Sequence, residues 1–144
     1  MLKLSGKIIR IHAVDVSKDL TLIKVSTNRN LPEILRREMA YLATERPIPF
    51  GFAHYLLTEQ HQNLAQELPE GSDYSILPND YDYIGNNDIV RLSADRQSIR
   101  VLFRASSPNN SILLTEQCNN YCLMCSQPPK AADDSWILDE IESL

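Results

Sequence analysis

The chain has 144 residues, 43% of them apolar, which is enough to bury one ordinary hydrophobic core and a small appendage. The formal net charge is −5 and the Lys and Arg residues are scattered, so DNA or RNA is not an expected partner. No apolar stretch is long enough for a transmembrane helix or a secretory signal, so we expect no membrane association and a cytoplasmic location, where thiols stay reduced.

The N-terminal part of the chain predicts two strands and a helix. Residues 7–11 and 20–25 are β-branched runs of strand length, and the polar residues between them predict a hairpin. Asn30 is a candidate helix N-cap with Pro32 in the first turn. Apolar residues then recur at helical spacing, at Leu31, Ile34, Leu35, Met39 and Leu42. This stripe is expected to pack in the core, and neither Met39 nor Tyr41, which belong to the same predicted helix, receives a cofactor role.

The middle of the chain has a mixed pattern. Residues 50–57 are strand-like, and residues 59–68 have a modest helical period. Residues 73–88 combine Tyr, Asp, Asn and Gly, which is typical of a loop or a sheet edge. His54 and His61 have no carboxylate or second histidine at ligand spacing, so we interpret them as core or surface histidines.

A second hairpin is predicted near the end of this region. Residues 88–92 and 98–104 are strand-like and flank a polar turn. One face of the second strand is apolar, with Ile99, Val101 and Phe103. Arg100 and Arg104 fall on the other face, which is typical of a solvated surface and also suits a peptide substrate with acidic residues.

Residues 105–110 have the composition of a linker, rich in Ser, Asn and Pro, and they set the expected domain boundary. The expected fold class is α+β. Residues 1–105 form a β-rich N-terminal domain with one or two helices and a role in docking a peptide or partner protein. Residues 106–144 form a separate segment.

That segment contains all three cysteines of the chain, in the run CNNYCLMC at Cys118, Cys122 and Cys125. Three thiols in so short a span do not make a disulfide framework, whereas thiolates that converge on a loop suit a soft metal or an iron–sulfur cluster. Residues 111–115 just before them predict a buried strand of a parallel sheet. The cysteines therefore fall at the carboxyl end of a strand, where βα barrels carry their active sites.

The spacing C-x3-C-x2-C resembles the signature of the radical SAM superfamily. The resemblance implies that Cys118, Cys122 and Cys125 hold a [4Fe-4S] cluster whose fourth iron binds S-adenosylmethionine. It also implies that the reduced cluster cleaves this cofactor to a 5′-deoxyadenosyl radical, which abstracts a hydrogen atom from the substrate. The family usually has an aromatic residue beside the adenine, just before the last cysteine. Here that position is Met124, whose thioether can pack on adenine, with Tyr121 close by.

The wider run NSILLTEQCNNYCLMCSQPPK, residues 110–130, resembles the C-type maturase of the His-Xaa-Ser repeat peptide system. This resemblance implies a ribosomally made precursor peptide as substrate and a second radical SAM protein beside the enzyme. For residues 106–144 it implies the first βα unit of a (βα)6-type partial barrel. Asp133 or Asp134 can cap the crossover helix of that unit, which begins at Ser135.

Only part of such a barrel fits in the chain. Each βα unit takes roughly 30 residues, so six units need on the order of 180, whereas about 34 residues follow Asn110. We therefore expect the N-terminal part of a truncated or split enzyme. Such a chain binds the cluster but releases little 5′-deoxyadenosine by itself.

Other interpretations of the cysteines stay open. A structural zinc site needs a fourth ligand, and the three histidines of the chain, His12, His54 and His61, are all far upstream. A thioredoxin-like redox pair at Cys122 and Cys125 leaves Cys118 without a role. Buried structural cysteines predict apolar neighbours, but Asn and Ser residues surround these three. A non-catalytic interaction module built by residues 1–105 is a further alternative.

Overall fold

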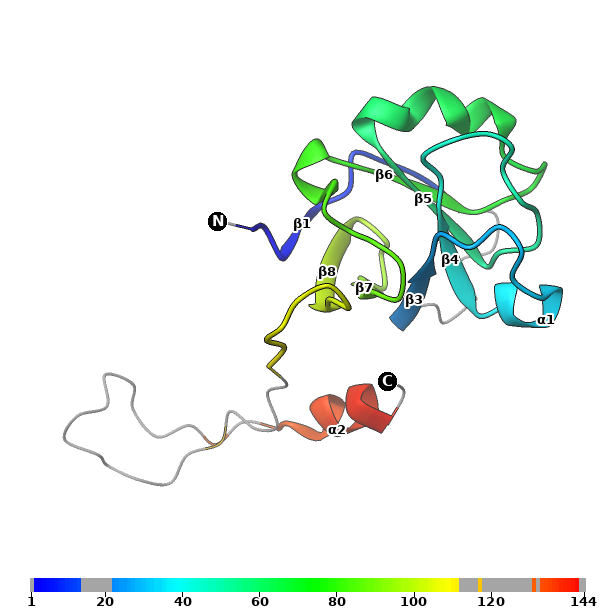
Figure 1. Ribbon diagram of the computed structural model, residues 1–144. Coiled ribbons are helices and arrows are strands. Elements are labelled where there is room, and N and C mark those ends of the chain that lie inside the picture. The colour runs from blue at the N-terminus through cyan, green and yellow to red at the C-terminus, as the bar shows by residue number, and fades with distance from the viewer. Residues whose placement is uncertain (1, 14–21, 112–116, 118–130, 132, 143–144) are drawn as a thin grey trace. The chain divides into compact units, whose positions relative to one another are not determined.

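The computed structural model describes residues 2–13, 22–111, 117, 131 and 133–142 (Figure 1). The chain divides into two compact units, Met1–Pro108 and Asn109–Leu144, and the division falls inside the segment with linker composition. The fold is mixed α+β and consists mostly of one eight-stranded sheet with few helices, which confirms the α+β class. None of the helices in the described ranges is long and apolar enough to cross a membrane.

The first unit contains the whole sheet and three short helical segments among its described residues. The strands are β1 (Ser5–Lys7), β2 (Arg10–His12), β3 (Leu22–Ser26), β4 (Met39–Leu42), β5 (His54–Thr58), β6 (Tyr74–Leu77), β7 (Ile89–Leu92) and β8 (Ser98–Phe103). The helical segments are α1 (Glu33–Arg36) and the 3₁₀ helices η1 (Glu59–Glu67) and η2 (Asn79–Tyr81). The strand order is β1-β8-β7-β3-β4-β5-β6-β2, in which β3 to β6 are parallel neighbours and the other pairs are antiparallel.

The N-terminal segment joins the two edges of this sheet. β1 pairs with β8 at one edge, and β2, which follows after Ile8 and Ile9, pairs with β6 at the other. The Ile8 amide donates to the Gln97 carbonyl at 2.8 Å, and the Ile9 amide donates to the Ile76 carbonyl at 2.8 Å. The adjacent residues Ile8 and Ile9 therefore bond to strands at opposite ends of the strand order, which requires the sheet to curl. Figure 1 shows the sheet.

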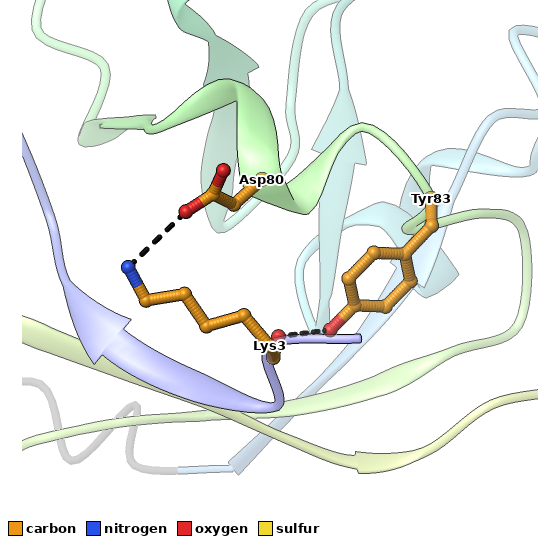
Figure 2. Close-up of polar contacts among 3 residues, drawn as sticks. All are labelled: Lys3, Asp80 and Tyr83. Carbon is orange, nitrogen blue, oxygen red and sulfur yellow. Dashed lines mark hydrogen bonds and ion pairs between the residues drawn. The ribbon is translucent and has the colours of Figure 1, made fainter. Parts of the chain in front are cut away.

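Side-chain contacts hold the start of this segment (Figure 2). The Lys3 ammonium lies 3.2 Å from Asp80 Oδ2, and the Lys3 carbonyl accepts a hydrogen bond from the Tyr83 hydroxyl at 2.6 Å. The ion pair is exposed and adds little stability. In β1, a Cβ atom at Gly6 would lie 2.7 Å from the Tyr81 hydroxyl, so the segment passes closer to Tyr81 than a larger residue allows.

Buried apolar side chains form two clusters on opposite faces of the sheet. Along β4, Ala40 and Leu42 belong to one cluster and Tyr41 to the other, as strand alternation requires. The inner cluster contains Ile23, Val25, Ala40, Leu42, Leu56, Leu77, Tyr81, Ile84, Val90, Leu92, Ile99 and Val101. The outer cluster covers β4 to β6, where η1 packs, and contains Tyr41, Ala43, Phe52, Tyr55, Leu57, Leu64 and Ile76. The strands β4 to β6 thus bury both faces.

The predicted hairpin between residues 7–11 and 20–25 is wrong. Strands form in both regions, but β3 pairs with β4 and β7, and β2 pairs with β6. The apolar side chains of β3, Ile23 and Val25, are buried at the centre of the sheet, which requires a neighbour on each side. The N-terminal strands instead complete the two edges.

The predicted helix from Asn30 onwards is also largely wrong. The helix α1 spans Glu33–Arg36 only, and Met39 lies in strand β4. Three consecutive residues of β4, Ala40 to Leu42, are all buried, which fits a strand covered on both faces and not a one-sided helix. The two apolar residues that do lie in α1, Ile34 and Leu35, are 76% and 47% exposed, so they are not core residues.

The later strands agree better with the sequence pattern. The hairpin of β7 and β8 confirms the second predicted hairpin. The region 73–88 is more ordered than predicted, because it contains β6 and η2. Arg104 lies beyond the end of β8, with its guanidinium 4.9 Å from the centre of the Tyr83 ring, so Arg100 and Arg104 do not share a strand face. A bulge beside Ile89 shifts the register at that end of the hairpin.

The second unit contains α2 (Ser135–Glu142), which begins where the sequence predicts a helix. Ile137 is buried on this helix, whereas Trp136 and Leu138 are exposed. Most of the predicted strand at residues 111–115 lies outside the described residues, so the strand stays a prediction.

Candidate functional site

The predicted cluster ligands Cys118, Cys122 and Cys125 lie outside the described residues, and so do Tyr121 and Met124, predicted near the adenine. The residues that flank them in the chain are described. These flanking residues are Gln117, which precedes Cys118, and the residues at the start of α2.

A hydrogen bond joins the two ends of the cysteine-containing segment. The Gln117 amide donates to Asp134 Oδ2 at 3.2 Å. Asp134 is buried, and its carbonyl accepts from the Ile137 amide at 2.9 Å in the first turn of α2. The residue before the first cysteine is thus tied to the residue before the helix. The two described residues that flank the cysteine-containing segment are therefore in contact.

Asp133 adds a second polar contact at the helix start. Its Oδ1 accepts a hydrogen bond from the Ser135 amide at 3.1 Å. The pKa of the Asp133 carboxyl lies below its ordinary value because the Ser135 side chain and backbone donate to it. The Asp133 side chain therefore caps the start of α2, which confirms the prediction that Asp133 or Asp134 caps it, whereas the Asp134 carboxylate accepts from Gln117.

A separate group of polar side chains is buried in the first unit. His54 at the start of β5 contacts Ser75 of β6, with Nε2 and Oγ 2.8 Å apart. Next to them, Arg96 Nη1 donates to Asp73 Oδ2 at 3.1 Å, and both side chains are less than a tenth exposed. Arg96 comes from the turn between β7 and β8, where its backbone has φ of 54°. The curl of the sheet therefore brings three elements together around this ion pair.

The electrostatics of this group favour a neutral imidazole. Burial lowers the pKa of His54 from 6.5 to about 4; the Asp73 carboxylate opposes this shift and the Arg96 guanidinium adds to it. His54 Nδ1 is buried and has no hydrogen-bond partner among the residues that the structure describes. A buried lone pair without a donor costs less than a buried N–H without an acceptor, so Nε2 carries the proton and donates to Ser75.

The arrangement resembles a histidine-activated serine only in composition. Both Ser75 and His54 are fully buried, so no substrate reaches the hydroxyl. We interpret the four residues as a polar contact that joins β5, β6 and the turn before β8. His54 is thus a core histidine, in line with the sequence interpretation, and His61 contacts Thr58, with Nδ1 and Oγ1 2.8 Å apart.

The sequence did not reveal Asp73, Ser75 and Arg96 as a group. Asp73 and Ser75 are two residues apart, which puts them on one face of an extended chain. This spacing was the one indication in the sequence that their side chains lie near each other. The pairing with Arg96 depends on a left-handed turn residue and on the curl of the sheet. In the ranges that the structure describes, no three His, Cys, Asp or Glu side chains form a group suited to a metal ion.

Comparisons of the chain with protein-family models, with curated proteins and with solved structures find no match. The assignment of the cysteine loop therefore depends on the residues themselves. It rests on the spacing of the three cysteines and on the hydrogen bond between Gln117 and Asp134, which flank them.

Proposed function

We propose that Cys118, Cys122 and Cys125 bind a [4Fe-4S] cluster, and that the chain acts in the radical modification of a ribosomally made peptide. The observation that carries this proposal is the C-x3-C-x2-C spacing. The bond between Gln117 and Asp134 supports it, because it brings together the two residues that flank the cysteine-containing segment. In this proposal residues 111–115 and α2 are the strand and helix of the first unit of a (βα)6-type barrel.

The donor set fits such a cluster. Thiolates are its usual ligands, and the chain has three cysteines, so one iron of the four is left without a protein thiolate. When bound, the cluster together with S-adenosylmethionine supplies the one-electron chemistry that removes a hydrogen atom from the substrate. The chain supplies the three thiolates, and Tyr121 and Met124 supply side chains that can pack against the adenine.

Anaerobic reconstitution with iron and sulfide tests the proposal. We expect the purified chain to bind iron and labile sulfide and to show a broad absorption near ~400 nm, as thiolate-bound clusters do. Cys118→Ala, Cys122→Ala and Cys125→Ala should each lose this absorption and most of the iron, because each removes one protein ligand. Ser126→Ala, which changes the residue next to the last cysteine, is the matched control and should keep both.

The outcomes separate the alternatives. Unchanged iron content in all three cysteine variants would contradict the cluster assignment. Zinc bound in place of iron would favour a structural zinc domain, and a folded chain that binds neither metal would favour a non-catalytic interaction module.

A further inference from the structure

One half of the sheet carries basic side chains and no acidic ones. The strands β1, β8, β7 and β3 contain Lys7, Arg100, Arg91 and Lys24, and none of the four strands contains Asp or Glu. The other four strands also lack Asp and Glu, but they contain only one Lys or Arg residue, Arg10, so the cations of the sheet are concentrated in this half. Lys7, Arg100 and Lys24 are exposed, and Arg91 is half-buried.

The four basic residues lie on the outer face of the sheet. Their strand neighbours, such as Ile23, Val90 and Ile99, belong to the inner apolar cluster. Because side chains alternate along a strand, Lys24, Arg91 and Arg100 point the other way. In β1 the inward position is that of Gly6, against Tyr81, so Lys7 also points outward.

The strand registers arrange these cations in a diagonal line. Arg100 lies opposite Arg91, and the row continues to Ser5 of β1 and Leu22 of β3. Lys7 is two residues beyond Ser5, and Lys24 is two residues beyond Leu22 in the opposite sense, because β1 and β3 run in opposite directions. With strands ~4.8 Å apart and a rise of ~3.4 Å per residue, the line is about 20 Å long. We call Lys7, Arg100, Arg91 and Lys24 the basic stripe.

The charges of the stripe favour an anionic partner. Lys7, Lys24 and Arg100 form no ion pair with any other residue that the structure describes. The helical segments α1 and η1 pack elsewhere, on β4 and on β5 and β6. Three exposed cations on one face, without an ion pair to a described residue, favour an anionic partner.

We propose that the basic stripe docks an extended acidic peptide. At ~3.3 Å per residue, about six residues match the length of the stripe. Half-buried Leu22 and Ile89 lie beside the cations on the same face, so a peptide with alternating acidic and apolar side chains matches both features. Four cations on a chain of negative net charge suit a short acidic segment better than a long nucleic acid. Only the identification of this peptide with the precursor rests on the proposed function.

Fluorescence anisotropy of the full chain tests the docking. The probe is a fluorescein-labelled peptide of three Glu-Leu repeats, measured at about 50 mM and about 200 mM salt. We expect binding that weakens at the higher salt concentration, and an affinity at least about tenfold lower in the double variant Lys24→Glu/Arg100→Glu. The matched control, Arg10→Glu/Arg37→Glu, changes the net charge equally from exposed positions on other elements and should stay within about twofold of the wild type.

Several results would overturn the proposal. An equal loss in both double variants would show that only the overall charge matters. Tighter binding of a single-stranded DNA of equal charge, or of vesicles with anionic lipid, would assign the stripe to a different partner. Circular dichroism checks that the variants fold. If Lys24→Glu/Arg100→Glu does not fold, Lys24→Gln/Arg100→Gln takes its place, and its affinity for the peptide should fall about threefold or more. Cys118→Ala should keep peptide binding while it loses iron, so failure of the stripe and failure of the cluster are distinguishable.

Discussion

His54 makes the stability of the first unit depend on pH. Its pKa falls from 6.5 in the unfolded chain to about 4 in the folded protein, because burial disfavours the charged imidazole beside Asp73 and Arg96. Between these values the unfolded chain binds a proton that the folded protein does not. The free energy of unfolding is therefore highest above pH 6.5 and falls as the pH is lowered towards about 4. A shift of this size corresponds to a loss of about 3 kcal/mol.

Urea denaturation over this pH range measures the effect. His54→Gln keeps an amide that can donate to Ser75 but does not titrate, so we expect it to remove most of the slope. His12→Gln changes an exposed histidine on β2 and should leave the slope in place. If the His54→Gln variant lost stability on acidification as steeply as the wild type, other groups would have to be responsible.

The cysteine loop and the buried ion pair differ in how much of each is visible in the sequence. Ligand spacing is local, so Cys118, Cys122 and Cys125 indicate a soft-metal site without any knowledge of the fold. The contact of Asp73 with Arg96 joins residues 23 positions apart, across a turn whose backbone favours glycine. Such a pair is defined only once the sheet has curled. The sequence therefore allows a site of the first kind to be proposed, whereas it missed the buried pair.

At the scale of elements, the close passage of β1 over Tyr81 gives a packing prediction. Gly6→Ala would put a methyl group 2.7 Å from a buried hydroxyl, so we expect a loss of about 1–3 kcal/mol in the free energy of unfolding. Tyr81→Phe alone should be close to neutral, because that hydroxyl has no hydrogen-bond partner. The double variant should regain the stability lost in Gly6→Ala, since the second contact, with Lys3, involves the end of a flexible and exposed side chain.

Denaturation of the four proteins of this double-mutant cycle measures the coupling. A coupling of at least about 1 kcal/mol between Gly6 and Tyr81 supports closure of the sheet by the N-terminal segment. Additive effects would contradict it. Gly85→Ala is the control for a glycine substitution without a steric contact, because a Cβ atom at Gly85 would have open space around it. Gly71→Ala is unsuitable because Gly71 has a φ of 77°, which strains any other residue.

The elements also show which strand pairings a sequence can predict. The hairpin of β7 and β8 was predictable because its turn is short and its strands are neighbours in the chain. The pairing of β2 with β6 joins residues more than sixty positions apart and has no local signal. For β4, the apolar residues happened to recur at helical spacing, but burial on both faces selects a strand. Tertiary context therefore overrode the local period at Met39 to Leu42.

At the scale of the whole molecule, the two apolar clusters of the sheet belong to the first of the two units. Every member of the inner and outer clusters falls before Pro108. The basic stripe also lies in Met1–Pro108, whereas the three cysteines and α2 lie in Asn109–Leu144. The two proposed activities, peptide docking and cluster binding, are thus carried by different units.

This separation predicts that the two activities can be divided by truncation. A chain that ends at Pro108 keeps both apolar clusters and all eight strands, so we expect its free energy of unfolding to stay within about 1 kcal/mol of the full chain. It should bind the Glu-Leu peptide as the full chain does, and it should bind no iron after reconstitution because it lacks the cysteines. Denaturation, anisotropy and iron analysis of the same preparation check the three expectations together. Loss of folding or of peptide binding would show that Asn109–Leu144 contributes to the first unit, and retained iron would show that the cluster ligands lie elsewhere.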